Sequence, residues 1–328
     1  MKFSVKTALF LLFSLGLLAF ALRNIQWSDI RGQFAQARYG WLLPLALSIV
    51  ATFGLRAARW RLALQALGYR PSLFHATVAV SAGNLASLII PGAGELTRCG
   101  TLQRTDGIPL AQGVGSVVAE RLVDVGMLLV LLVLTLTLEY QRLFTVFSDL
   151  LTARFQAMPG WLWPVMTGLI LLASGLIIWW LIRPASAANA VPGLWQRFGE
   201  GLLGLRRLPH PAWYVALSIL IYFVSFLTMY FAGLATPQFL SNPRIGLSLL
   251  TIGSVGGLAV PTQGGVGTYH VLFALVLGLY GFGHAPALAM ATFIHAVVMG
   301  LSLIVSGLSF LLIPFILNRR EQKTAPVL

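Results

Sequence analysis

Long apolar runs fill most of this chain, and their length constrains the fold more than any other feature. A helix that crosses a bilayer needs about 20 mostly apolar residues. Of the 328 residues, 58% are hydrophobic and 9% are charged, and the mean hydropathy is +0.85. Soluble domains are about one quarter charged, so this composition excludes an ordinary soluble enzyme, a disordered chain and a coiled coil. We predict an all-α polytopic membrane protein with one integral membrane domain over residues 1–328. The predicted full spans are Val5–Leu22, Trp41–Leu55, Pro109–Leu138, Trp161–Ile182, Pro211–Ala235 and Ala285–Phe315.

Two further apolar runs, Leu73–Ile90 and Ile245–Val260, end in clusters of proline and glycine. Proline removes a backbone donor and glycine relaxes the chain, so both stop a helix. Non-helical backbone at membrane depth is tolerated only where it is buried in protein or lines a cavity. We therefore predict two re-entrant helical hairpins, with return limbs near Leu96–Arg104 and Thr268–Tyr280. The breaking residues are Pro91, Gly92 and Gly94 in the first run and Pro261, Gly264, Gly265 and Gly267 in the second.

The two breaks resemble each other in sequence. Residues 84–91 (NLASLIIP) align with residues 254–261 (SVGGLAVP), and Gly94 matches Gly264 three residues after each proline. In the predicted topology the two hairpins enter from opposite sides, so residues 73–138 and 245–315 form an inverted repeat. Paired broken helices in two halves indicate a substrate site near the bilayer midplane. The alternative is that proline and glycine only let helices pack closely.

The charge of the chain is strongly biased, with 22 Lys and Arg against 9 Asp and Glu and a net charge of +13. Loops beside anionic headgroups account for this excess, so we expect no nucleic-acid partner. Six spans and two hairpins place four basic groups on one side, which the positive-inside rule assigns to the cytoplasm. We predict a bacterial-type cytoplasmic (inner) membrane, with both termini cytoplasmic. The groups are Lys2 and Lys6; Arg56, Arg59, Arg61 and Arg70; Arg183, Arg197, Arg206 and Arg207; and Arg319, Arg320 and Lys323.

Arg56, Arg59 and Arg61 are predicted to lie at the cytoplasmic surface, where they bind lipid phosphate non-specifically. Five other charged residues are expected at membrane depth. Glu120 lies about 16 Å along its predicted helix, and the hydrocarbon core is about 30 Å thick. Glu120 and Asp124 share one face of that helix. Charges in lipid cost several kcal/mol and should face a partner or water. The remaining members are Arg121 on the same helix and Glu95 and Arg98 on the first break.

Two interpretations of this charged cluster remain open. In one, ion pairs hold the first hairpin against its neighbour. In the other, Arg98 and Arg121 grip an anionic headgroup, because a planar guanidinium can bind two phosphate oxygens at once, while the acids orient the arginines or titrate. We predict a substrate site with no catalytic residue, metal or cofactor. Its predicted residues are Asn84, Glu95, Arg98, Glu120, Arg121 and Asp124, with the prolines and glycines of both breaks as hinge and cavity backbone.

These motifs resemble the flippase-like family named after the transmembrane region of lysylphosphatidylglycerol synthase. The pattern is Pro-x-x-Gly-Glu-x-x-Arg at Pro91–Arg98, then Glu-Arg-x-x-Asp at Glu120–Asp124, then the glycine cluster after Pro261. The resemblance covers most of the chain. It implies lipid translocation between leaflets, or the handling of polyprenyl, hopanoid or phospholipid intermediates. The sequence shows no aminoacyl-transferase domain like that of the fused enzymes, so we expect no lipid aminoacylation.

We therefore expect a lipid flippase or transporter without ATPase activity, which moves an anionic or polyprenyl-linked lipid between the leaflets. The expected partner is a membrane phospholipid or a polyprenyl lipid, and the sequence indicates no oligomeric state. One alternative is a non-catalytic accessory protein bound to a lipid- or glycan-synthesis enzyme. Another is a membrane enzyme that acts on a lipid phosphate through Glu95, Glu120 or Asp124.

Overall fold

The structure is a computed structural model that describes residues 27–90, 92–142, 199–201, 203–239, 241–260, 262–314 and 316, together with positions 16, 18 and 19. The predicted spans Val5–Leu22 and Trp161–Ile182 lie outside these residues, apart from those three positions, and so do Pro91 and Pro261. Every regular element within the described residues is a helix, which agrees with an all-α fold. The elements are α2 (Trp27–Ala35), η1 (Tyr39–Trp41), α3 (Leu42–Gln65), α4 (Leu73–Ile89), α5 (Ala93–Asp106), α6 (Leu110–Leu138), η2 (Gly204–Arg207), α10 (Pro211–Leu234), α11 (Pro243–Ala259), η3 (Gln263–Gly265), α12 (Thr268–Leu279) and α13 (His284–Phe310).

Among the described residues, three helical segments are long and apolar enough to cross a membrane. They are Tyr39–Gln65, which joins η1 to α3, together with α10 and α13. α6 is longer, with 29 residues that extend about 44 Å, but it carries the charged cluster Glu120–Asp124 in its interior. The predicted spans Pro109–Leu138, Pro211–Ala235 and Ala285–Phe315 coincide with α6, α10 and α13 to within a few residues.

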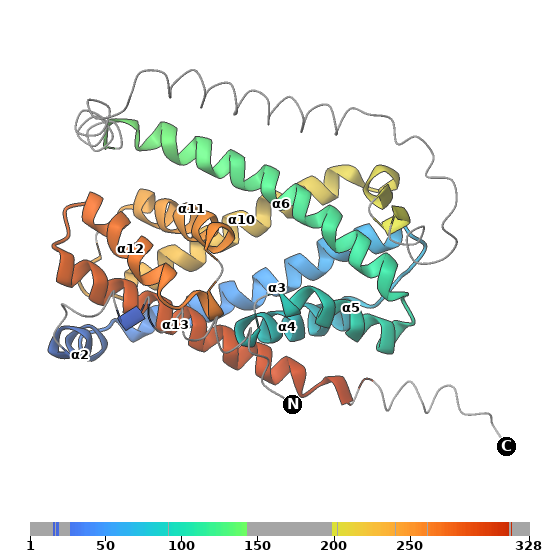
Figure 1. Ribbon diagram of the computed structural model, residues 1–328, viewed down its shortest axis with the longest axis horizontal. Coiled ribbons are helices and arrows are strands. Elements are labelled where there is room, and N and C mark those ends of the chain that lie inside the picture. Colours follow the sequence, from blue (N-terminus) through green and yellow to red (C-terminus); the bar gives the residue numbers. More distant parts are fainter. Residues whose placement is uncertain are drawn as a thin grey trace.

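The two pairs of shorter helices lie at opposite ends of the molecule (Figure 1). α4 and α5 occupy one end and α11 and α12 the other, while α3, α10 and α13 run lengthwise between them and α6 passes along one side. α3 packs against α10 and α4, and α13 packs against α12 and α4. The buried core between these helices includes Trp60 from α3, Leu249 from α11 and Met290 from α13.

α3 is longer than the predicted span Trp41–Leu55. We expected that span to end at Arg56, but the helix continues to Gln65. Arginine, alanine, leucine and glutamine are strong helix formers, and they make up most of this extension. The prediction that Arg59 lies at the cytoplasmic surface is therefore wrong: only 2% of the residue is exposed. Its charge is balanced by carboxylates inside the protein instead of by solvent.

The first predicted hairpin appears as α4 followed by α5, with a break at the predicted glycine cluster. Ser72 begins α4, because its hydroxyl accepts a hydrogen bond from the backbone N–H of His75 (3.0 Å). Gly92 has a φ of 80°, which a residue with a side chain rarely adopts, and precedes α5. The two limbs approach so closely that a Cβ at Gly94 would overlap the carbonyl oxygen of Gly83. Gly94 is therefore required for the close packing of α4 on α5.

The second predicted hairpin consists of α11, η3 and α12. Asn242 begins α11, since its side-chain oxygen accepts a hydrogen bond from the N–H of Arg244 (3.0 Å). The break before α12 is longer than that of the first hairpin. Gly264, Gly265 and Gly267 all have positive φ there, so the chain turns in a conformation that favours glycine. The predicted return limb is α12, which ends one residue earlier than predicted.

The tips of the two hairpins contact each other. The side-chain amide of Gln263 donates a hydrogen bond to the backbone carbonyl of Ile89, the last residue of α4. Each long helix contacts both hairpins. α6 packs against α5 and also against α11, where the hydroxyls of Thr135 and Thr251 lie 2.8 Å apart, and α13 packs against α12 and also against α4. Each hairpin thus contacts the long helix that follows the other hairpin in sequence.

Candidate functional site

The most deeply buried charges in the described part of the chain form a network between α3, α5 and α6. Glu120 is 1% exposed, and its two carboxylate oxygens pair with different arginines. Oε1 lies 3.5 Å from Nε of Arg59, and Oε2 lies 3.0 Å from Nη2 of Arg98. Arg59 also pairs with Asp124, with 2.7 Å between Nη2 and Oδ1. Because Glu120 and Asp124 share one face of α6, a single arginine on α3 contacts both.

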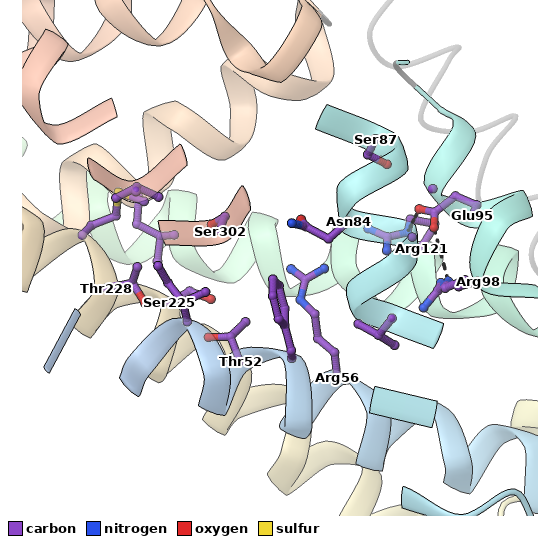
Figure 2. A pocket seen from close by; sticks show the side chains of 18 of the residues that line it. Thr52, Arg56, Asn84, Ser87, Glu95, Arg98, Arg121, Ser225, Thr228 and Ser302 are labelled. Carbon is purple, nitrogen blue, oxygen red and sulfur yellow. Dashed lines mark ion pairs between the residues drawn. The ribbon is translucent and has the colours of Figure 1, made fainter. Parts of the chain in front are cut away.

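The more exposed part of the network lies at the start of α5. Glu95 bridges two arginines: its Oε2 is 3.3 Å from Nε of Arg98, and its Oε1 is 3.1 Å from Nε of Arg121. Arg121 also pairs with Asp124 at 3.2 Å. The side chains of Glu95 and Arg121 are 40% and 43% exposed, whereas that of Arg98 is 6% exposed. The contacts of Glu95 with both arginines are drawn in Figure 2.

Together these six contacts close a ring in which cations and anions alternate, and we call it the ion-pair ring. Each member contacts exactly two neighbours of opposite charge. The structure therefore brings together all five charged residues predicted for the cluster and adds Arg59. In order around the ring, the members are Arg59, Glu120, Arg98, Glu95, Arg121 and Asp124.

Aromatic and hydroxyl groups hold the buried arginines in place. The guanidinium of Arg98 lies over the ring of Trp60, 4.8 Å from its centroid, and the indole N–H of Trp60 donates to Ser116 (3.0 Å). Arg59 donates to the hydroxyl of Ser218 on α10 (3.3 Å). Such cation–π contacts and hydrogen bonds compensate part of the cost of removing arginine from water. The ring is thus anchored to α3, α6 and α10 on its buried side.

A seventh charged residue, Arg56, lies next to the ring without joining it. It forms no ion pair or hydrogen bond with any other described residue, and its buried Nε has no partner among them. Figure 2 shows its guanidinium extending from α3 into a cavity, on the side of Asn84. Arg56 is one helical turn from Arg59, but Arg59 pairs with two carboxylates whereas Arg56 lines the cavity and pairs with none of the described residues.

The cavity next to the ring has a volume of about 430 Å³, within the range of small-molecule sites. It is lined by residues from both halves of the chain, including Asn84 on α4 and Tyr269 on α12. Asn84 donates to the hydroxyl of Ser306 on α13 (2.9 Å), which orients its amide. Its wall combines apolar and polar side chains. The polar and charged side chains that line it are Thr52, Arg56, Asn84, Ser87, Glu95, Arg98, Arg121, Ser225, Thr228, Tyr269 and Ser302.

A second cavity of about 410 Å³ lies at the facing tips of the hairpins. The first break contributes Gly92 to its wall, and the second contributes Gly264 and Gly265. Gly94 lines the first cavity, whereas Gly267 lines neither of the two. Because Asn84 and several other residues line both spaces, the two cavities adjoin each other.

Sequence reasoning missed the roles of Arg56 and Arg59. For Arg59, the charge count could have indicated its role, because the predicted cluster contains three acids at membrane depth but only two arginines. A third buried cation is needed to balance them, since unpaired charge in an apolar interior is costly. Arg59 lies between Ala58 and Trp60 in a segment that continues as an apolar helix. No comparable sequence signal singles out Arg56.

The family described as the lysylphosphatidylglycerol synthase TM region matches residues 7–318 of the chain. The chain therefore belongs to this family, as its motifs suggested. No match was found among curated proteins or among solved structures. Together with the membrane-length helices, the family identifies a multi-pass membrane protein of lipid-related function.

Proposed function

We propose that this member of the lysylphosphatidylglycerol synthase TM region family is a lipid flippase of a bacterial-type inner membrane. It moves an anionic or polyprenyl-linked lipid between the two leaflets. The observation that carries the proposal is a cavity of about 430 Å³ inside an otherwise apolar membrane protein, whose wall includes Glu95, Arg98 and Arg121 of the ion-pair ring together with several hydroxyl groups. A lipid whose headgroup is to cross the hydrocarbon core needs such a polar path, because lipid itself solvates charge poorly.

The proposed topology has six full spans and two re-entrant hairpins, with both termini in the cytoplasm. Segments 73–138 and 245–315 are proposed to be inverted repeats. Two observations support this arrangement: the hairpins lie at opposite ends with their tips in contact, and each contacts the long helix of the other. Such repeats allow alternating access when one half rocks against the other around a central site.

In the proposed mechanism the headgroup takes the place of Glu95. Glu95 bridges Arg98 and Arg121, the two arginines predicted to grip an anion, and it is the most exposed acid of the ring. A headgroup phosphate offers the same two guanidinium groups at least two charged acceptor oxygens, as a carboxylate does. Glu120 and Asp124 stay with Arg59 and keep the buried side of the ring together. The ring is thus both a clasp and a headgroup site.

Leaflet exchange in liposomes tests this function. We expect purified protein to accelerate the exchange of headgroup-labelled anionic lipids, and Arg98→Ala and Arg121→Ala each to reduce that rate while membrane insertion is retained. Arg142→Ala is the matched control, because Arg142 pairs with Glu139 at the end of α6, away from the cavity. Exchange no faster than in protein-free liposomes, across several headgroups and with a proton gradient imposed, would contradict the proposal.

If the protein transports no lipid, the same purified preparation can be used to test the two alternatives, an accessory protein and an enzyme. Stoichiometric co-purification of a lipid- or glycan-synthesis enzyme would support an accessory role. Chemical conversion of a lipid by the purified protein alone would support an enzyme.

A further inference from the structure

The charged residues around the first cavity do not balance. The ion-pair ring is neutral, because it contains three arginines and three carboxylates. Arg56 adds one cation that lines the same cavity and has no ion pair within the described residues. Four arginines against three acids leave a formal charge of +1 around this cavity.

The surroundings of Arg56 make this excess charge unfavourable. The ring cations Arg121 and Arg59 repel it, and Asp124 is the one ring anion that attracts it appreciably. Asp124 is already engaged by Arg59 at 2.7 Å and by Arg121 at 3.2 Å. The buried Nε of Arg56 has no hydrogen-bond acceptor among the described residues. An unpaired cation inside a protein is destabilising, so this position is suited to a counter-anion from outside the chain.

We propose that Arg56 is a binding residue for a single oxyanion, and that it selects a phosphodiester headgroup whose net charge is −1. This inference extends the proposed function to a substrate class, and rests on that function where it names a lipid as the source of the anion. While Glu95 remains in the ring the surplus is one positive charge, so an anion that binds first at Arg56 neutralises the cavity with one negative charge. A phosphodiester carries one negative charge at neutral pH, whereas a phosphomonoester carries between about 1.5 and 2.

The geometry also favours a headgroup over a small hydrated ion. Figure 2 shows the Arg56 guanidinium beside Asn84, with Arg121 and Glu95 to one side of both, and all four residues line the cavity. A phosphodiester there reaches Arg56 with one oxygen and remains close to Arg121, whose side chain is 43% exposed. The hydroxyls of Thr52 and Ser225 line the same cavity and suit the polar remainder of a headgroup.

Thermal stability of the purified protein in detergent tests the inference without any transport. The probes are dihexanoylphosphatidylglycerol, a singly charged diester; dihexanoylphosphatidic acid, a monoester; dihexanoylphosphatidylcholine, which has no net charge; and inorganic phosphate. A ligand that binds only the folded state raises the melting temperature. We expect phosphatidylglycerol to raise the melting temperature of the wild type most among the three lipids.

Substitutions at Arg56 give the decisive readout. Without ligand, Arg56→Gln should melt at the same temperature as the wild type or higher, because the substitution removes an uncompensated charge. Its apparent affinity for phosphatidylglycerol should fall at least about tenfold, and Arg56→Lys should restore part of it. Arg61→Gln is the matched control: it removes the same charge from α3 at a residue whose Nε donates to Pro71 and which does not line the cavity.

The outcomes separate the source of the anion from the claim itself. An Arg56-dependent response that is stronger for phosphatidylglycerol than for inorganic phosphate supports a lipid headgroup, and the reverse order supports a free anion at the same site. Equal affinity of Arg56→Gln and wild type for every probe would overturn the inference, and so would a response to phosphatidylcholine or phosphatidic acid that matches phosphatidylglycerol. Arg56-dependent binding without leaflet exchange would leave this inference standing while the proposed function fails.

Discussion

Both hairpins consist of two helices joined at a glycine-containing break, but their limbs pack through different side chains. In the first, glycines let α4 and α5 approach backbone to backbone, and the start of α5 carries Glu95 and Arg98 of the ion-pair ring. In the second, the positions that align with these two residues are Gly265 and Thr268, and aromatic side chains such as Tyr269 fill the space against the glycines of α11.

The difference extends to the helix that follows each hairpin. When Pro109 of α6 is aligned with Pro286 of α13, Glu120 corresponds to Val297, and the other two charges on α6 also meet apolar counterparts. In the second hairpin, Thr262 and Thr268 instead satisfy each other across the break at 3.1 Å. A repeated scaffold thus carries charge in one copy only: glycines of both breaks line the two adjoining cavities, whereas the charges of the ion-pair ring that come from the repeats belong to the first copy.

The largest effect on this comparison is expected from Glu120→Ala. The substitution leaves Arg59 and Arg98 each with one anion fewer in a buried site, and breaking buried ion pairs costs about 3–5 kcal/mol. Its counterpart Val297→Ala removes only apolar contacts, worth about 1–2 kcal/mol. Unfolding in mixed micelles measures both free energies. Equal losses at the two positions would show that the ring does not stabilise the charged half.

Gly94→Ala should have the next largest effect. The new Cβ overlaps backbone atoms of Gly83, which cannot move without separating α4 from α5, and overpacking of this kind costs up to about 3 kcal/mol. Gly264→Ala meets only the flexible end of Met299, so its cost is the left-handed backbone alone, about 1–2 kcal/mol. The same unfolding measurement compares the two. A larger loss for Gly264→Ala would reverse the proposed contrast between the hairpins.

Thr268→Val should have the smallest effect. The residue aligns with Arg98, but its hydroxyl serves only the local contacts with Thr262 and with the backbone carbonyl of Val260. We expect a loss of about 1 kcal/mol and unchanged binding of anionic lipid. Lipid retention measured by native mass spectrometry checks the second point. Loss of anionic lipid in this variant would mean that the second hairpin also selects the headgroup.

The sequence located the described helices and the five charged residues of the cluster, but it did not predict that Arg59 pairs with them. Proline and glycine are local signals, so the two breaks and the limbs on each side could be located to within a few residues. Glu120 and Asp124 stood out because charge is rare in an apolar helix. Arg59 did not, because basic residues near the end of an apolar run are typical of the membrane surface. Only the packing of α3 against α6 shows that it points inward.

The central claim, that a headgroup replaces Glu95 between Arg98 and Arg121, is tested most directly by lipid retention in Glu95→Gln. Native mass spectrometry would compare the fraction of wild-type and variant protein that carries bound phosphatidylglycerol. The control is Glu139→Gln, because Glu139 pairs with Arg142 at 3.1 Å and lines neither of the two hairpin cavities. Removing the competing carboxylate should raise retention, and Arg121→Gln should lower it. Retention in Glu95→Gln equal to or below that of the wild type would contradict the claim.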